Sequence, residues 1–492
     1  MIGLKIAAGW LVLAPGTITV DINNPLFNPE SIPGTITYPF GLPVEANQLA
    51  LNFPHVRADQ GERIADEPCE FYIEGQLRWV GAVVYLEWDE AKALYSYNFV
   101  ADAADLRGRI NGVTLASLDL GRVALALVPD AADYALPCVR NMAFYGGKVA
   151  AYGGILNYYG DGAYRPAGTE AFHRPIVPFL RLIPLLRRML AALGYTLAGP
   201  WLDEPEAQAL ILYSDRAAED DAGVLLVDFA VNRHVPDLPV ADVLVALQQQ
   251  LGLAYSFHPK RRELSIRALR DVAGDSQYID RTGGKAHTTA VTKTGFVLKM
   301  ALESADDLNK TLDTGWAELR VGAGQQELST TAGTLHVVEE KDRINTSRTW
   351  RVPAVEAKGA SLAFEAGDDS RCGLRLLFDR GLCPDSRQHL YPLATWDRED
   401  LAGNVVGSST LHWDGPNGLY ATWHRAWLDF LDRGTTREAT MQFGVADLLT
   451  LDPGQKEMVN HRKYLWEKVT LSLKTTGSRL ETAAFTYRHI LR

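Results

Sequence analysis

The chain has 492 residues, with a hydrophobic content of 47% and a charged content of 22%. These proportions are those of an ordinary globular protein and exclude a disordered chain or a coiled coil. The length allows about three domains with sizeable cores. The formal charge of −11 argues against electrostatically driven nucleic-acid binding, because such binding needs clustered Lys and Arg that displace counterions from phosphates.

The first 27 residues contain an apolar run that could be mistaken for a secretion signal. A single lysine, Lys5, precedes the run, and residues 17–22 alternate apolar and polar side chains as a strand does. We therefore expect a strand and no cleaved signal, with Pro15 and Gly16 forming the turn of a hairpin. No apolar stretch approaches the roughly 20 residues of a transmembrane helix, so we expect no membrane-spanning segment.

Residues 1–135 are expected to form a β-rich N-terminal domain. Aromatic and β-branched residues crowd the stretch 71–100, where Gly81 is expected to separate two strands. Five prolines between residues 24 and 43 favour extended, turn-punctuated backbone over helix. Repeated short strands of this kind are typical of an antiparallel sandwich or barrel.

Residues 141–168 are rich in Gly and Tyr, and this composition predicts an irregular connecting loop. Exposed tyrosines on such a loop are the alternative, because they can stack on sugars or dock a partner. The loop and the first of two repeated units together make up the expected segment 136–222.

Two stretches, 183–213 and 241–268, share one design: an amphipathic helix that ends at a glycine and continues into a hairpin. Gly194 and Gly252 end the helices because glycine readily adopts the left-handed conformation at a helix C-terminus. The repeat predicts an internal duplication, with the second unit in residues 223–275. The apolar positions superpose at one constant offset, which matches Leu186 with Leu244, Met189 with Leu247, Leu193 with Leu251, and Leu197 with Tyr255.

The remaining chain divides into a β-rich domain, 276–410, and a C-terminal segment, 411–492, that combines a helix with strands. The helix is predicted over residues 418–434, because its apolar side chains recur on one face and Gly434 closes it. The overall prediction is a β-dominated α+β fold with short packed helices. The apolar face of the C-terminal helix consists of Leu419, Trp423, Trp427, Phe430 and Leu431.

Three stretches together resemble the hub proteins of phage tails, of the late-control type and particularly those of prophages in Bacteroidetes-like bacteria. The first comprises residues 22–27, 38–43 and 53–55, the second lies within 238–267, and the third within 418–469. The resemblance implies a homotrimer with two tube-like antiparallel barrels per subunit. The N-terminal domain would be one barrel, and the second helix–hairpin unit, 223–275, would belong to the other.

Six such barrels in a trimer would form a pseudo-hexameric ring that adapts the sixfold tail tube to the threefold spike and lines the channel. The implied partners are the tail tube or distal tail protein, the spike and the tape-measure protein, and DNA would pass without specific binding. The acidic charge is compatible with such a passage. The implied location is a virion tail or tail-like particle, assembled in the cytoplasm of the host bacterium.

Catalytic, cofactor-binding and metal-binding residues are not predicted, and no cofactor is expected. The eleven histidines show no ligand spacing such as HxH or HExxH, so we expect structural roles for His55 and His424. There is no GxSxG motif, and residues 283–285 lack the flanking residues of a phosphate-binding loop. The cysteines show no CxxC pair and are expected to be isolated buried thiols: Cys69, Cys138, Cys372 and Cys383.

The best enzymatic candidate is a pair of segments, 396–400 and 412–415, in which acids stand beside aromatic residues as in glycosidase clefts. Glycoside hydrolysis needs two carboxyl groups roughly 5–10 Å apart, and Asp397 and Asp414 are the candidates. A carbohydrate-binding or glycan-cleaving tail-tip or surface protein is therefore the alternative function. A secreted β-rich adhesin is a third.

Overall fold

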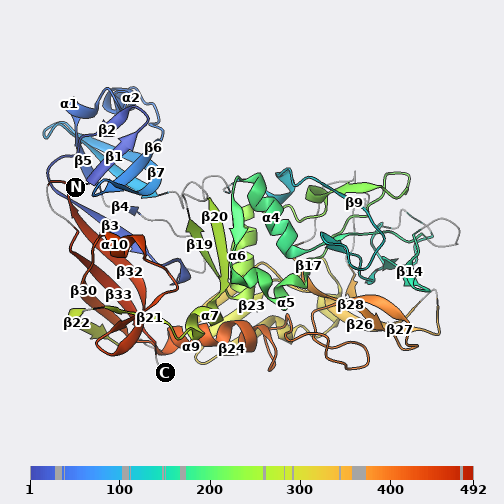
Figure 1. Cartoon of the computed structure of the whole chain (residues 1–492). Coiled ribbons are helices and arrows are strands. Elements are labelled where there is room, and N and C mark those ends of the chain that lie inside the picture. Colours follow the sequence, from blue (N-terminus) through green and yellow to red (C-terminus); the bar gives the residue numbers. More distant parts are fainter. Residues whose placement is uncertain are drawn as a thin grey trace.

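The computed structural model confirms a β-dominated α+β fold in which antiparallel pairing prevails (Figure 1). The molecule is elongated, with the first and the last strands of the chain curled together at one end and the remainder extending away from them. No helix in the described parts is long and apolar enough to cross a membrane. The structure describes residues 2–27, 36–37, 39–101, 110, 112–146, 149, 151–166, 173–258, 262–281, 283–290, 293–342, 345–356, 373–476 and 480–490.

The N-terminal strands form a curled antiparallel sheet in the order β2-β1-β6-β7-β8-β5. Two short helices lie at its free end (Figure 1). Alternate side chains point inward, as the burial of every second residue in β8 shows. The elements are β1 (Ile2–Ile6), β2 (Gly9–Leu11), β5 (Phe40–Pro43), α1 (Val44–Asn47), α2 (Pro54–Asp59), β6 (Glu67–Ile73), β7 (Gln76–Asp89) and β8 (Leu94–Ala101).

A single buried amide helps to close this sheet into a barrel. Beyond β2, the Ala14 N–H donates to the Gly41 carbonyl of β5 at 2.9 Å. The Asn47 side chain accepts from the Val12 N–H and donates to the Val12 carbonyl, both at 2.9 Å. It also donates to the Pro43 carbonyl at 2.8 Å. Asn47 thus replaces a missing strand partner and satisfies every donor and acceptor of its own amide.

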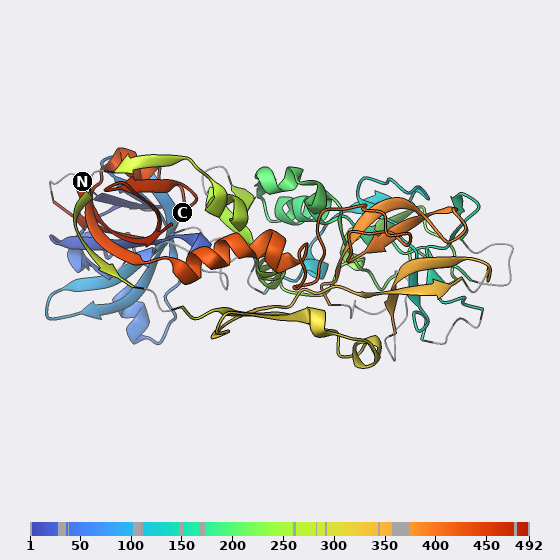
Figure 2. The same cartoon turned by 90° about the horizontal axis from the view of Figure 1, so that it is seen from below.

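The C-terminal strands form a second barrel, visible as a ring in Figure 2. Its strands follow the order β31-β32-β33-β30-β22, and β21, which directly precedes β22 in the chain, returns to pair with β31. One polar segment, 278–289, therefore closes the ring from both sides. The strands are β21 (Tyr278–Arg281), β22 (Gly283–Thr289), β30 (Thr436–Gln442), β31 (Lys456–Val459), β32 (Arg462–Lys474) and β33 (Thr482–His489), with α10 (Val445–Leu449) beside them.

The two barrels adjoin and share one hydrophobic cluster. The strand β3 (Thr17–Asn23) pairs with the C-terminal half of β32, and β4 (Ile36–Thr37) links β3 to β8. Aromatic side chains fill both interiors, so each barrel is a packed core without an open lumen. The largest fully buried examples are Phe71, Tyr95 and Phe99 in the N-terminal barrel and Trp466 and Tyr487 in the C-terminal one.

Two turn predictions in the N-terminal region are wrong. Pro15 and Gly16 join no hairpin, because β2 pairs with β1 whereas β3 pairs with β32 and β4. Gly81 does not end a strand but lies inside β7, opposite Ala101 of β8. A Cβ atom on Gly81 would lie 2.1 Å from the Val100 carbonyl oxygen, so the glycine permits a close approach of two strands.

Both predicted helices of the duplicated unit are present, as α4 (Leu182–Ala192) and α6 (Val240–Leu251). Gly194 and Gly252 follow them with φ of +80° and +58°, which confirms their role in ending the helices. The second hairpin is also confirmed, because β19 (Leu253–His258) pairs with β20 (Glu263–Ala268).

The first hairpin is absent. The strand β16 (Thr196–Ala198) pairs in parallel with β20, whereas β17 (Leu210–Leu212) pairs with β28. Pro200 and Pro205 each begin a short helix that carries the chain away before it can fold back. The sheet β16-β20-β19 therefore has three strands, and residues 223–275 do not form the second barrel expected from the sequence.

The C-terminal helix is confirmed. A π-helical turn (Tyr420–His424) continues into α9 (Arg425–Arg433), and Trp423 and Trp427 are buried on the predicted face. The guanidinium of Arg270 lies 4.2 Å from the centre of the Trp423 ring, which adds a cation–π contact. Strands from different expected segments pair with each other: β3 of segment 1–135 pairs with β32, and β22 of segment 276–410 pairs with β30. The division into five segments stays a prediction.

The part of the molecule distant from the barrels consists of short sheets around a second large core (Figure 1). Its strands are β9 (Arg122–Ala124), β10 (Tyr134–Ala135), β11 (Val139–Asn141), β12 (Ile155–Leu156), β13 (Tyr159–Gly160), β14 (Ala163–Tyr164), β15 (Phe179–Leu180), β18 (Asp228–Ala230), β23 (Phe296–Met300), β24 (Glu318–Val321), β25 (Gln326–Thr330), β26 (His336–Lys341), β27 (Thr349–Val355), β28 (Leu376–Pro384) and β29 (Leu390–Thr395). The short helices are α5 (Pro205–Gln208), α7 (Leu269–Gly274) and α8 (Leu308–Thr311).

We expect Asn47→Ala to destabilise the N-terminal barrel by about 2 kcal/mol or more, because the Val12 and Pro43 backbone groups lose buried partners. Amide hydrogen exchange should accelerate in residues 9–14 and 40–47. Gln60→Ala, at an exposed position of the same barrel, is the control and should leave exchange unchanged. Equal protection in both variants would contradict the role given to Asn47.

Candidate functional site

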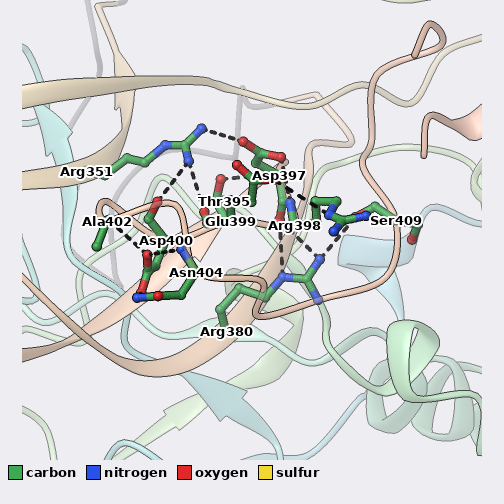
Figure 3. Close-up of polar contacts among 10 residues, drawn as sticks. All are labelled: Arg351, Arg380, Thr395, Asp397, Arg398, Glu399, Asp400, Ala402, Asn404 and Ser409. Carbon is green, nitrogen blue, oxygen red and sulfur yellow. Dashed lines mark hydrogen bonds and ion pairs between the residues drawn. The ribbon is translucent and has the colours of Figure 1, made fainter. Parts of the chain in front are cut away.

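The first candidate site surrounds Asp397, in the loop that follows β29 (Figure 3). One carboxylate oxygen of Asp397 accepts a hydrogen bond from the Arg351 guanidinium of β27 at 2.6 Å. The other accepts from the Arg398 N–H at 2.7 Å, while the Asp397 N–H donates to the Thr395 hydroxyl at 3.0 Å. Both oxygens of Asp397 are therefore engaged in holding the loop.

A second arginine, Arg380 of β28, holds the same loop from the other side (Figure 3). Its guanidinium donates to the Asp397 carbonyl at 3.1 and 3.2 Å and to the Ser409 carbonyl at 3.2 Å. It also forms an ion pair with Glu206 of α5 at 2.9 Å. Burial lowers the pKa of Arg380, and the neighbouring Glu206 opposes that shift. Arg380 thus joins the loop to α5, whose Glu206 lies 174 residues before Arg380 in the chain.

Asp400 stabilises a turn within the loop. One of its carboxylate oxygens accepts from the N–H groups of Ala402 and Asn404, both at 2.9 Å, and the other accepts from the Asn404 side chain at 2.8 Å. Side-chain mimicry of a backbone turn is a common structural role of aspartate. The Arg351 guanidinium also donates to the Glu399 carbonyl at 2.9 Å.

The two candidate carboxylates lie in different surroundings. Asp414 is exposed, whereas both carboxylate oxygens of Asp397 accept hydrogen bonds from its own chain. A glycosidase requires one carboxyl group free to donate a proton and a second to act as nucleophile or base. Asp397 and Asp400 instead have their oxygens occupied by groups of their own chain, which is the arrangement of a structural network.

The aromatic residues of these segments also have a structural role. The ring of His412 lies between two indoles, 3.5 Å from Trp396 and 4.4 Å from Trp316, with interplanar angles of 16° and 8°. Burial lowers the pKa of His412 to about 3, so the imidazole is neutral at pH 7. One face of Trp396 is thus covered by the His412 ring, and the Arg351 guanidinium lies 5.8 Å from the centre of the Trp396 ring.

Four tyrosines of the Gly- and Tyr-rich segment are buried and Tyr152 is half-buried, which contradicts the alternative of exposed tyrosines. The Tyr158 hydroxyl donates to Asp342 at 3.0 Å, and the Tyr145 hydroxyl donates to Glu219 at 2.8 Å. Residues 147–148, 150 and 167–168 of the segment lie outside the described residues. The buried tyrosines are Tyr145, Tyr158, Tyr159 and Tyr164.

The two histidines singled out in the sequence, His55 and His424, have hydrogen-bond partners within the chain. His55 shares a hydrogen bond of 2.6 Å with the Tyr95 hydroxyl, and buried His424 lies 3.0 Å from the Gln250 carbonyl. Within the described ranges, no three His, Cys, Asp or Glu side chains are grouped so that they could hold a metal ion. Three of the four cysteines, Cys69, Cys138 and Cys383, are free and buried, and Cys372 lies outside the description.

Sequence reasoning missed the polar features that close the barrels and anchor the loops. A buried cluster joins Tyr145, His173 and Glu219, with contacts of 2.8 to 2.9 Å. Arg348 forms buried ion pairs with Asp342 at 3.8 Å and Asp385 at 2.5 Å. These partners lie up to 74 residues apart in the chain, so a local sequence pattern does not predict that they pair.

No family model and no curated protein matches the chain. Solved structures that match include the 43 kDa tail protein of prophage MuSo2 from Shewanella oneidensis and a tail protein from Neisseria meningitidis MC58. Each has a TM-score of 0.35 and 9% identity, with 99% of this chain and 95% of the other covered. An Escherichia coli type VI secretion component, described as similar to the T4 tail proteins gp27 and gp5, has a TM-score of 0.32 and 8% identity, with 98% and 76% covered. Similarities of this strength do not establish a common fold or function.

The two candidate acids should differ in their effect on stability. We expect Asp397→Ala to destabilise the fold by about 1–3 kcal/mol, because it leaves a partly buried Arg351 without its partner. Asp414→Ala, at an exposed position, should have little effect. Urea unfolding measures the difference. Release of reducing ends from bacterial polysaccharides that both substitutions abolish would instead establish a glycosidase.

The buried imidazole of His412 should make the fold sensitive to acid. Its pKa in the folded state, about 3, lies below the ordinary value of 6.5. The unfolded chain therefore binds more protons between these values, and stability present above pH 6.5 is lost as the pH falls toward 3. We expect a loss of about 1–2 kcal/mol between pH 7 and pH 5.

The substitution His412→Phe keeps a ring between the two tryptophans and removes the titrating group. The fall in the urea midpoint between pH 7 and pH 5 should be smaller in this variant than in the parent. His287→Gln, at an exposed position, serves as the control and should retain the parental pH dependence. An unchanged slope in His412→Phe would show that another group is responsible.

Proposed function

We propose that this chain is a structural baseplate hub subunit of a phage-like tail, in a phage, a tailocin or an injection machine. The observation that carries the proposal is the presence of two closed, filled barrels side by side in one chain (Figures 1 and 2). A barrel has no open strand edges, so it can serve as a rigid block in an assembly without uncontrolled edge pairing.

Two barrels per chain explain how a threefold assembly can meet a sixfold one. Three subunits arranged around an axis contribute six barrels, which form a ring of approximately sixfold symmetry. The proposed homotrimer thereby contacts the sixfold tail tube or distal tail protein through its barrels. In this proposal the second barrel comes from the C-terminal strands and the segment 278–289, and not from residues 223–275.

The elongated shape supports different contacts at the two ends of the subunit. Both barrels lie at one end, while the short sheets around the second core extend away from them (Figure 1). We propose that this distant end makes threefold contacts with the spike, where six equivalent blocks are not needed. The tape-measure protein would approach along the axis of the ring.

The acidic balance of the chain suits a channel through which DNA passes. A formal charge of −11 gives a passing polyanion no net attraction, because tight nonspecific binding depends on clustered cations. In this role the protein resides in the virion tail or tail-like particle and is assembled in the cytoplasm of the bacterial host.

The proposed role is not enzymatic. Of the two glycosidase candidates, Asp397 is engaged by Arg351 and by a backbone N–H group, whereas Asp414 is exposed. No observation among the described residues favours a glycan-cleaving protein or a secreted adhesin over the hub.

Oligomeric state and assembly test the proposal. Mass photometry of the purified chain should give a species of three times the chain mass, and cryo-EM of that species should show six barrels in one ring. The chain should also be incorporated into tail particles when it is produced together with tube and spike proteins. A strictly monomeric chain that is left out of such particles would refute the proposal.

A further inference from the structure

Helices α1 and α2 lie at the free end of the N-terminal barrel (Figure 1), where exposed apolar side chains of α2 and of the turn before it form a small surface. We call this surface, formed by Leu49, Phe53 and Val56, the apolar tip. The exposed fractions of the three side chains are 79%, 37% and 42%. The opposite side of α2 packs on the barrel, where the His55 ring lies 5.0 Å from that of Trp88. The apolar tip therefore lies on the side of α2 that does not pack on the barrel.

The backbone of the loop holds these side chains outward. Asn52 and Phe53 both adopt left-handed conformations, with φ of 53° and 49°, which are unfavourable for residues other than glycine. The Phe53 N–H donates to the Gln48 carbonyl at 2.8 Å, and the Asn52 N–H donates to the Leu49 carbonyl at 3.2 Å. These bonds fix the turn at Phe53, whose side chain is 37% exposed.

A bulge in β7 adds a further apolar side chain nearby. The register with β8 shifts between Tyr85 and Glu87, so Leu86 has no partner across the strands. Its side chain is 43% exposed. Burial raises the pKa of Tyr85, and the negative charges of Asp59 of α2 and Glu87 of β7 raise it further, so both carboxylates lie near Tyr85.

The surroundings of the apolar tip carry an excess of negative charge. Two cations of this region are paired, Arg57 with Glu62 at 2.7 Å and Lys92 with Asp89 at 2.6 Å, and a third, Arg63, is exposed. The remaining acids are exposed and form no ion pair within the described part of the chain. They are Glu45, Asp59, Glu87 and Glu90.

We propose that the apolar tip is a docking surface for a protein that offers an apolar centre surrounded by Lys and Arg. An exposed apolar group rimmed by charge is the usual form of a protein interaction site, and the acidic rim selects a basic partner by complementarity. A second copy of this chain would bring the same acidic rim to the tip, so like charges would face each other in a tip-to-tip contact. The inference stands independently of the proposed role in a tail.

Two synthetic amphipathic peptides of equal length, one of Leu and Lys and one of Leu and Glu, probe the surface of the full-length chain by fluorescence anisotropy. We expect binding of the Leu/Lys peptide, weakened by added salt, and no comparable binding of the Leu/Glu peptide. The double substitution Leu49→Ser with Val56→Ser should weaken binding about tenfold. The charge reversal Asp59→Lys with Glu87→Lys should remove the salt dependence.

Val227→Ser is the matched control, because Val227 is 85% exposed and lies far from the barrels in the sequence and in the sheet order. It should leave binding unchanged, and circular dichroism should show that all variants fold. Equal affinity for both peptides, or a Leu49/Val56 variant that binds like the parent, would overturn the proposal. A dimer lost in that variant, or flotation with phosphatidylcholine vesicles, would assign the tip to a second copy or to lipid and would also overturn it.

Discussion

A curled β-sheet must satisfy the N–H and C=O groups along its two edges, and this requirement organises one end of the molecule. The N-terminal barrel meets it with one backbone bond, from Ala14 to Gly41, and with the amide of Asn47. The C-terminal barrel meets it with the segment 278–289, which pairs on both sides. Because the strands of both barrels close into rings, they surround the aromatic side chains that are buried inside.

The elements that the sequence predicts correctly are those whose signal is local. The helices over 182–192 and 425–433 arise from apolar side chains at helical spacing, and Gly194 and Gly252 end helices through their own backbone freedom. The closing strand β22 could not be predicted, because its polar composition carries no strand pattern of its own. It becomes a strand only through pairing with β30, about 150 residues later.

The candidate site shows the same division between local and distant information. The proximity of acids and aromatic residues in 396–400 and 412–415 is readable from the sequence, but their role depends on partners elsewhere. Arg351 engages Asp397, and Trp316 covers the ring of His412. These contacts turn a pattern typical of glycosidases into an anchor for a loop. The negative prediction of no catalytic residues rested on absent motifs, whereas the structure supplies a positive role for the acids.

The pairing of β3 with β32 has a consequence for the biosynthesis of the protein. Residues 17–23 meet their partners 468–474 only after about 450 further residues have been made. At about 5–20 residues per second, translation leaves β3 without this neighbour for tens of seconds. The strands β1, β2 and β5 to β8 of the N-terminal barrel are complete by residue 101, whereas the C-terminal barrel needs strands as late as β33. In that interval β3 is an open template for strand exchange with another nascent chain, so the order of synthesis favours a chaperone-guarded intermediate.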